Sequence, residues 1–176
     1  MAPRKEGRAG AMTGETAKTE AIALAIRPWS RTSHIVTWLT RDAGTVRTLV
    51  KGAVRPKSAF LGQYDLFYTC SLVYYTHRRG GLCAVREVAP ENRRDALRGR
   101  WRETSIAGYA AEFAGEFAPP DASSAEWFAL LGDFLDSLCA APEGMDAREA
   151  LLSVVRFETR ALALAGLALL IKRRRA

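Results

Sequence analysis

The hydrophobic periodicity of this 176-residue chain changes once, near residue 90. Before that point, short segments rich in β-branched and aromatic residues alternate with Gly, Pro and Asp turns, a pattern typical of strands. After it, apolar residues recur at intervals of three and four, as they do in amphipathic helices. The sequence therefore predicts an α+β protein with a β-rich part followed by a helical part.

The β-rich part contains five strand-like segments. Pro28 is expected to end the first, because proline cannot donate to a ladder, and Gly44 permits the turn after the second. Five short strands over about 70 residues suit a small closed barrel, for which a five-stranded OB-fold is the commonest choice with a nucleic-acid role. An SH3-like barrel is the nearest alternative. The predicted strands are 20–27, 33–40, 45–52, 64–77 and 82–88.

Three helices are predicted in residues 91–176, the first over 91–117, the second capped by Ser123 and the third by Asp146. Glu158 lies on the apolar stripe of the third helix, so it needs a partner, for which an arginine is expected. The side chains expected to be buried are Leu97, Trp101, Ile106, Tyr109, Ala110, Phe113 and Phe117, then Trp127, Leu130, Leu131, Phe134, Leu135 and Leu138, then Leu151, Leu152, Val155, Leu162 and Leu169.

The net charge of +7 is unevenly distributed. Residues 17–90 hold 11 basic and four acidic side chains, whereas residues 91–171 hold eight basic and 13 acidic ones. A basic barrel predicts an anionic partner such as nucleic acid. The longest apolar run, 161–171, is about half of the ~20 residues that span a bilayer, and residues 1–18 lack the apolar core of a secretory signal. No membrane association and a cytoplasmic, nucleoid-associated location are therefore expected.

The candidate binding residues are cations at strand ends and in loops of the barrel. Lys51–Lys57 places three of them within seven residues, and each is able to neutralise a phosphate. Aromatic residues interleave with these cations, and any that are exposed can stack on bases, although most are expected to fill the barrel core. The predicted nucleic-acid-binding residues are Arg31, Arg47, Lys51, Arg55, Lys57 and Arg78, and the aromatic residues are Trp29, Trp38, Phe60, Tyr64, Phe67, Tyr68, Tyr74 and Tyr75.

Catalytic, metal and cofactor chemistry find little support in the sequence. His34 and His77 are the only histidines, and both fall in strand-like segments. The GxSxG, HExxH, P-loop and GxGxxG patterns are missing, so no enzyme, catalytic residue or cofactor is expected. The chain has no CxxC pair, so its cysteines are expected to be buried thiols rather than metal ligands. These cysteines are Cys70, Cys83 and Cys139.

Several segments, in order, resemble the bacterial RecO family. The N-terminal ones are Thr19–Ile22, Arg27–Thr37, Leu49–Arg55 with its Lys-Gly element, and Leu61–Gln63. A later segment, Arg156–Gly166, is similar to the family's helix of the type F-E-x-R-x-L-x-x-x-G. The resemblance covers nearly the whole chain after residue 18. It implies an N-terminal OB-fold followed by a helical domain.

The resemblance also implies a function. RecO-like proteins bind single- and double-stranded DNA, anneal complementary strands, and act with RecR to load RecA onto DNA coated with single-strand-binding protein. We therefore expect a disordered tail at 1–18, an OB-fold DNA-binding domain at 19–90 and a helical domain at 91–176. Many family members continue into a four-cysteine zinc element, whereas this chain ends ten residues after Gly166, so the helical domain is expected to be shortened at its C-terminus.

Two alternatives to this function stay open at the sequence level. One is an RNA-binding OB-fold module, since phosphate neutralisation and base stacking do not by themselves select DNA. The other is a protein-interaction adaptor whose basic face docks acidic tails.

Overall fold

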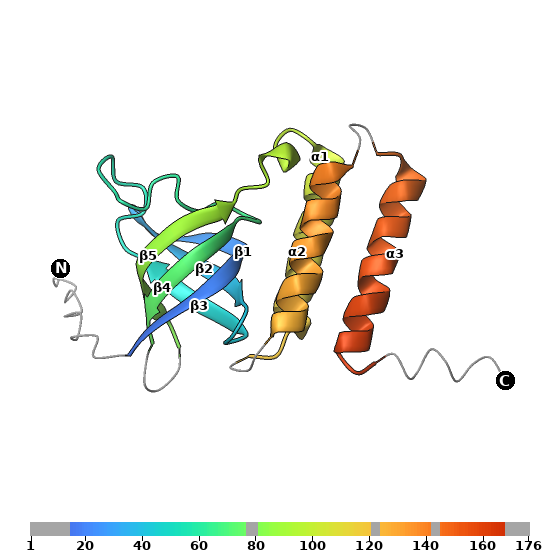
Figure 1. Cartoon of the computed structure of the whole chain (residues 1–176). Coiled ribbons are helices and arrows are strands. Elements are labelled where there is room, and N and C mark those ends of the chain that lie inside the picture. The colour runs from blue at the N-terminus through green and yellow to red at the C-terminus, as the bar shows by residue number, and fades with distance from the viewer. Residues whose placement is uncertain (1–14, 77–80, 121–123, 142–144, 168–176) are drawn as a thin grey trace, which may run out of the picture.

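The strands and helices follow one another in two blocks along the chain (Figure 1). The computed structural model describes residues 15–76, 81–120, 124–141 and 145–167. The strands are β1 (Thr16–Ser30), β2 (Ser33–Thr40), β3 (Thr45–Val50), β4 (Thr69–Tyr75) and β5 (Cys83–Asn92), and the helices are the 3-10 turn η1 (Asp95–Leu97), α1 (Trp101–Phe117), α2 (Ala125–Ala140) and α3 (Ala147–Leu164).

The five strands close into a barrel in the order β1-β2-β3-β5-β4. β1 pairs with both β2 and β4, which closes the sheet, and β3 pairs with β5 in parallel. Inward residues such as Val36, Trp38 and Leu72 are fully buried in the barrel core, and Thr37 and Val73 beside them are more exposed. This is the predicted five-stranded OB-fold followed by helices.

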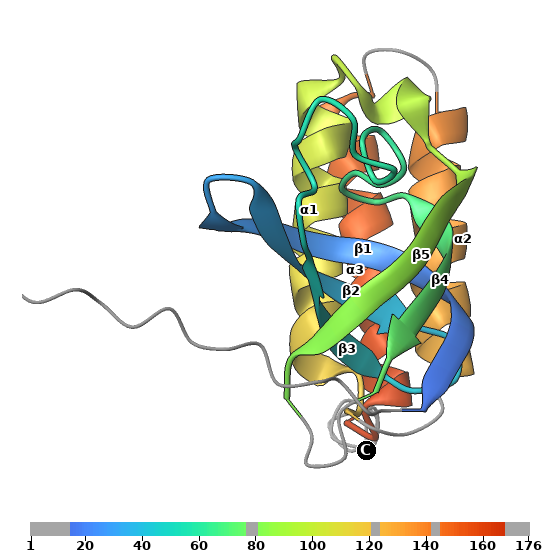
Figure 2. The ribbon, with the colours of Figure 1, turned by 90° about the vertical axis from the view of Figure 1, so that its left-hand side faces the viewer.

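β1 is longer than predicted at both ends. Residues 16–18, expected in the disordered tail, pair with 73–75 of β4, while residues 1–14 lie outside the described part. The strand also continues past Pro28, which pairs with His34. The register shifts between Pro28 and Ser30, where the β1–β2 hairpin extends beyond the barrel (Figure 2), so the missing donor interrupts little of the sheet.

β4 is shorter than the predicted strand over 64–77. Phe67 has a positive φ of 67°, a left-handed conformation that ends an extended segment. Its N–H donates to the carbonyl of Ala23 at 2.9 Å, and the N–H of Ala23 donates to the carbonyl of Tyr68 at 3.0 Å. Residues 64–68 therefore fold back onto β1 before β4 begins.

The helices cover one side of the barrel (Figure 1), and a second core fills the interface. α2 buries all six of its predicted apolar residues, with Leu131 and Leu135 fully inaccessible. α1 meets the barrel and α2 mainly through small residues, of which Ala107, Ala110 and Ala114 are fully buried. Small side chains let helix and barrel approach closely. None of the described helices is long and apolar enough to cross a membrane.

The predicted stripe of α1 is wrong at several of its large residues. Trp101 is 73% exposed, and Tyr109 and Phe117 are also exposed, because the buried face of α1 follows its alanines instead. The helix also begins ten residues later than predicted, since β5 runs to Asn92 and η1 follows it.

The predicted stripe of α3 is wrong in a similar way. Leu151, Leu152 and Val155 are exposed, because α3 packs through Phe157 and Ala161. The partner expected for Glu158 was an arginine, but the hydroxyl of Tyr109 on α1 donates to its carboxylate. A phenol provides the hydrogen bond that a partly buried carboxylate needs without adding a second charge.

The predicted caps have different outcomes. Asp146 caps α3 as predicted, accepting a hydrogen bond from the N–H of Glu149 at 2.8 Å. Ser124 is the residue that precedes α2, and its hydroxyl donates to the carbonyl of Thr40 at 2.6 Å rather than capping the helix. This bond ties the start of α2 to the barrel. Ser123 lies outside the described residues.

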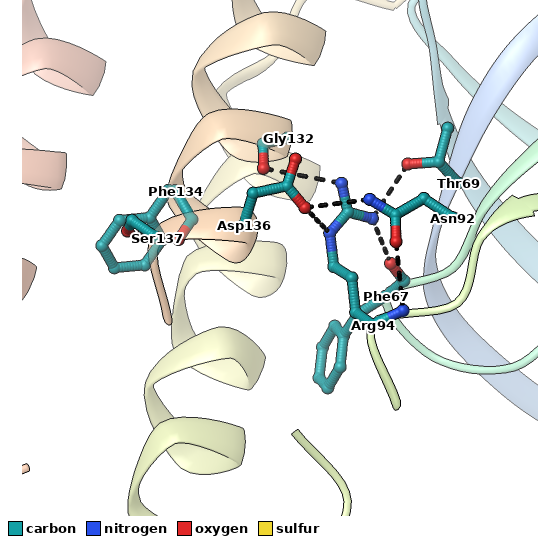
Figure 3. Close-up of polar contacts among 8 residues, drawn as sticks. All are labelled: Phe67, Thr69, Asn92, Arg94, Gly132, Phe134, Asp136 and Ser137. Carbon is teal, nitrogen blue, oxygen red and sulfur yellow. Dashed lines mark hydrogen bonds and ion pairs between the residues drawn. The ribbon is translucent and has the colours of Figure 1, made fainter. Parts of the chain in front are cut away.

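Arg94 joins the barrel to the helices (Figure 3). Its side chain is buried, and its Nε lies 2.7 Å from Oδ1 of Asp136 on α2. Its Nη1 donates to the carbonyl of Phe67 at 2.7 Å and to the hydroxyl of Thr69 at 2.9 Å. Asn92 donates to the same oxygen of Asp136 at 3.0 Å. Arg94 therefore holds α2 against Phe67 and Thr69, at the start of β4. We call this set of contacts the Arg94 joint.

Candidate nucleic-acid interface

The turn between β1 and β2 lies against the segment that follows β3. The N–H of Val54 donates to the carbonyl of Thr32 at 3.3 Å, and the N–H of Gly52 donates to the hydroxyl of Ser33 at 3.2 Å. These two bonds bring Arg31 of the turn close to Lys51 and the residues after it. Two predicted regions, separated by about twenty residues in the sequence, thus form one surface.

The segment after β3 is a compact coil. Gly52 has a φ of +67°, and a Cβ at this position would come within 3.2 Å of Cδ of Arg55. The N–H of Arg55 donates back to the carbonyl of Gly52 at 3.1 Å, and the N–H of Ser58 donates to the carbonyl of Arg55 at 2.9 Å. Glycine is favoured here because it allows the left-handed turn with the Arg55 side chain folded over it.

Arg31, Lys51, Arg55 and Lys57 are exposed, and we call these four residues the basic loop cluster. Within the part of the chain that the structure describes, the ion pairs of basic side chains involve other residues, such as Arg41 with Glu20 at 2.6 Å. The cluster therefore keeps its positive charge available to an anion in solution.

Arg47 extends this surface along β3. Val46, Thr48 and Val50 point into the barrel and are buried, so Arg47 faces outward from the strand, and the exposed Lys51 directly follows its last residue. Thr37 of β2 pairs with Arg47. The outer face of β2 and β3 thus connects Arg47 with the basic loop cluster.

A hollow of about 640 Å³ lies next to Arg47. Its wall includes Trp29 near the end of β1, Ile35 from β2, Cys83 at the start of β5 with Leu82 just before it, and Arg47 itself. Trp29 is 62% exposed. An exposed indole beside a guanidinium is able to stack on a base while the cation meets a phosphate.

The other aromatic residues mostly follow the expectation that they fill the core. Trp38, Phe67, Tyr68 and Tyr74 are buried, and Phe60, Tyr64 and Tyr75 are partly buried. Of the eight aromatic residues predicted near the cations, Trp29 is therefore the one that the structure leaves exposed for stacking. The sequence contained a signal for this, because Trp29 adjoins Pro28 at the predicted end of its strand.

His34 and Cys70 have contacts within the barrel that suit a structural role. His34 Nδ1 lies 2.9 Å from the hydroxyl of Tyr64, and burial raises the pKa of Tyr64 to about 12. Cys70 is buried, and desolvation raises the pKa of its thiol to about 12. Within the described ranges, His, Cys, Asp and Glu side chains form no group able to hold a metal ion. Arg78, His77 and the Lys172–Arg175 run lie outside these ranges.

The position of Arg94 between the barrel and the helices was not predicted from the sequence. This arginine lies among the charges of an acidic half of the chain, yet its side chain is only 3% exposed. The Asn-Arg-Arg-Asp order at the end of a strand was a weak signal for it, since nothing in the sequence indicates that Asp136 lies nearby.

These features define a class: an OB-fold barrel with an exposed basic face and an exposed indole, followed by helices. Residues 12–93 match the family described as recombination protein O, N terminal. The chain is also similar to several curated proteins named DNA repair protein RecO. It is 32% identical to the one from Geobacter metallireducens over 124 residues, 70% of this chain and 50% of that protein.

Two further relatives are matched over more of the chain. The identity is 30% over 156 residues with DNA repair protein RecO of Syntrophus aciditrophicus, covering 89% of this chain and 58% of that protein. The identity is also 30% over 155 residues with DNA repair protein RecO of Anaeromyxobacter sp., covering 87% of this chain and 57% of that protein. The chain thus spans between half and three fifths of the length of these relatives. It is similar to RecO proteins through its barrel and, in these relatives, well into its helices.

Proposed function

We propose that this protein binds DNA and anneals complementary strands in recombinational DNA repair. In this proposal residues 19–90 are the DNA-binding domain, residues 91–176 form the helical domain, and the protein works in the cytoplasm as a non-enzymatic mediator. The observation that carries the proposal is the basic loop cluster, whose four cations are exposed and unpaired with acidic groups in the described part of the chain. Similarity to DNA repair proteins RecO supports DNA as the polyanion.

The proposed mechanism is electrostatic. The basic loop cluster and Arg47 neutralise backbone phosphates, and Trp29 stacks on a base without selecting its sequence. Two complementary strands repel each other through their phosphates. A surface that neutralises both strands lowers that repulsion and raises their local concentration, so pairing becomes faster.

We propose that the partners are those of the RecO family. In this view the protein acts with RecR to load RecA onto single-stranded DNA coated by single-strand-binding protein. Because the chain spans only part of its relatives, this proposal has its own test. Co-elution with purified RecR on a sizing column supports it, and separate elution of the two proteins at micromolar concentration contradicts it.

The annealing of two complementary oligonucleotides tests the function. We expect the parent protein to accelerate annealing, and the Lys51→Glu, Arg55→Glu double variant to lose most of that acceleration. The matched control is Arg148→Glu, Arg156→Glu, which makes the same change in net charge on exposed positions of α3. Annealing at the spontaneous rate with the parent protein contradicts the function, and equal loss in the control contradicts the assignment of the site.

A competition between single-stranded DNA and RNA separates the proposal from an RNA-binding module. We expect DNA to displace a bound DNA probe at least as well as RNA of the same sequence. Displacement by RNA at a much lower concentration favours the RNA-binding alternative. Displacement by an acidic peptide, with no measurable DNA affinity, favours the adaptor alternative.

A further inference from the structure

Residues 93–102, which connect β5 to α1, form an unusually basic segment. They contain five arginines and one acidic residue, Asp95, although residues 91–171 as a whole carry more acidic than basic side chains. Five of the eight basic residues of that region therefore lie in these ten positions. The five are Arg93, Arg94, Arg98, Arg100 and Arg102.

These arginines have different surroundings. Arg94 is the buried joint described above, and Arg98 is exposed but lies 2.8 Å from Asp65. Arg93 is exposed and forms no ion pair within the described residues. Arg102 donates to the carbonyl of Met145, and Cζ of its guanidinium lies 5.2 Å from the centroid of the Trp101 ring. Among the residues that the structure describes, no carboxylate forms an ion pair with Arg93 or Arg102, so both keep their positive charge there.

Trp101 is the most exposed large apolar side chain in the described part of the chain, at 73%. It opens α1, and the guanidinium of Arg102 lies over its ring. With so much of its surface in solvent, the ring remains available for another planar group. An exposed tryptophan between cations has the composition of a stacking platform for nucleobases.

A hollow of about 610 Å³ lies beside this platform, lined by Arg98, Arg100, Trp101, Arg102 and Glu103 among others. Glu103 is 4% exposed, and its Oε1 has no hydrogen-bond partner in the described structure. A carboxylate beneath the hollow repels phosphate. Phosphate contacts are therefore favoured away from this carboxylate, at the arginines that flank Trp101 in the connection, with the base directed toward Trp101.

The platform lies at the same end of the barrel as the segment that follows β3. Figures 1 and 2 both place the start of α1 and the residues after β3 at the upper end of the molecule. The ion pair of Arg98 with Asp65 and the hydrogen bond of Arg98 with Tyr68, both 2.8 Å, tie the two regions together. A DNA strand that leaves the basic loop cluster at this end therefore comes next to the connection between β5 and α1.

We propose that this connection is a second contact site for single-stranded DNA, with Trp101 stacking on a base and Arg93 and Arg102 meeting the flanking phosphates. The inference rests on the proposed DNA-binding function and adds a site outside the barrel. It gives the single-stranded DNA a path from the OB-fold toward the helices. It also explains why a large apolar side chain stands in solvent at the start of α1.

Tryptophan fluorescence reports on this site directly. The chain has four tryptophans, and Trp38 and Trp127 are buried, so in a Trp29→Phe background Trp101 is the main exposed reporter. We expect oligo(dT) to quench the fluorescence of this variant and not that of the Trp29→Phe, Trp101→Phe variant. Absence of quenching in the first variant, although it binds the oligonucleotide, overturns the inference.

Affinity measurements separate this inference from the proposed function. We expect Trp101→Ala to weaken binding of a long oligo(dT) by on the order of tenfold, with Trp101→Phe close to the parent. The control is Leu151→Ala, which removes another exposed apolar side chain, at 64%, from α3. Parent-like affinity of Trp101→Ala, with weak binding by Lys51→Glu, Arg55→Glu, overturns the second site alone. No DNA binding by the parent overturns both proposals.

Discussion

The guanidinium of Arg94 donates to the backbone carbonyl of Phe67 at 2.7 Å, and both residues have a left-handed backbone, with φ values of 51° and 67°. Such conformations are uncommon for residues other than glycine, and the surrounding contacts stabilise them. The bond connects the residue that directs the chain into β4 with the residue that leads it out of β5. It therefore fixes where the helices stand relative to the barrel and its basic face.

Removal of the Arg94 side chain should destabilise the whole chain. We expect Arg94→Ala to lower the free energy of unfolding by about 3 kcal/mol, because it leaves the carbonyl of Phe67 without its donor and breaks a largely buried ion pair. Asp136→Asn should cost only about 1 kcal/mol, since that carboxylate is half-exposed. Urea unfolding of both variants measures this difference. An equal loss of unfolding free energy in the two variants would contradict the central role of Arg94 in holding the helices to the barrel.

The packing of α3 predicts a contrast between two apolar positions. Phe157→Ala should cost about 3–5 kcal/mol, because the ring is buried between Phe113 and Phe134. Leu151→Ala should change stability by no more than about 0.5 kcal/mol, because its side chain stands in solvent. Thermal or urea unfolding checks the pair. A large cost at Leu151 would mean that α3 packs through the face predicted from periodicity alone.

The Cys70 thiol predicts a loss of stability at high pH. Burial raises its pKa from 9.0 to about 12, so between these values the unfolded state loses a proton that the folded state retains. Stability is therefore unaffected by this group below pH 9 and falls as the pH rises toward 12. Urea unfolding at pH 8 and pH 10.5 should show a smaller decline for Cys70→Ala than for the parent. The same decline in both would contradict the burial of the thiol.

The hollow beside Arg47 predicts separate effects for its indole and its cation. Trp29→Ala should weaken binding of single-stranded DNA by on the order of tenfold at any salt concentration, because a stacking contact is lost. Arg47→Glu should instead reduce the salt dependence of binding, because a phosphate contact is lost. Fluorescence anisotropy at two salt concentrations distinguishes them. No change in either variant would place the DNA elsewhere on the barrel.

The sequence predicted the barrel well because β-branched segments and turn residues report local structure directly. It predicted the buried face of α2 for the same reason, since Leu131 and Leu135 follow the helical period. It failed for Trp101 and Leu151 because a helix with apolar residues on more than one side does not reveal which side meets a partner. That choice depends on tertiary contacts between segments distant in sequence.

The candidate site could be predicted in part. The excess of cations between residues 17 and 90 indicated the basic loop cluster, although nothing local indicated that hydrogen bonds from Gly52 and Val54 would bring Arg31 close to the other three cations. The exposure of Trp29 and Trp101 likewise depends on how the strands and helices pack. Charge counts are properties of the sequence, whereas the surface that carries the charges is a property of the fold.

The central claim is that the basic loop cluster neutralises DNA phosphates, and a salt series tests it most directly. Binding of a single-stranded oligonucleotide should fall linearly on a log–log plot against salt, with a slope of about 0.7 for each phosphate contacted. Lys51→Glu, Arg55→Glu should reduce the magnitude of that slope by about 1.4, while Arg148→Glu, Arg156→Glu leaves it near the parent value. Parent-like affinity and slope in the Lys51→Glu, Arg55→Glu variant would contradict the account.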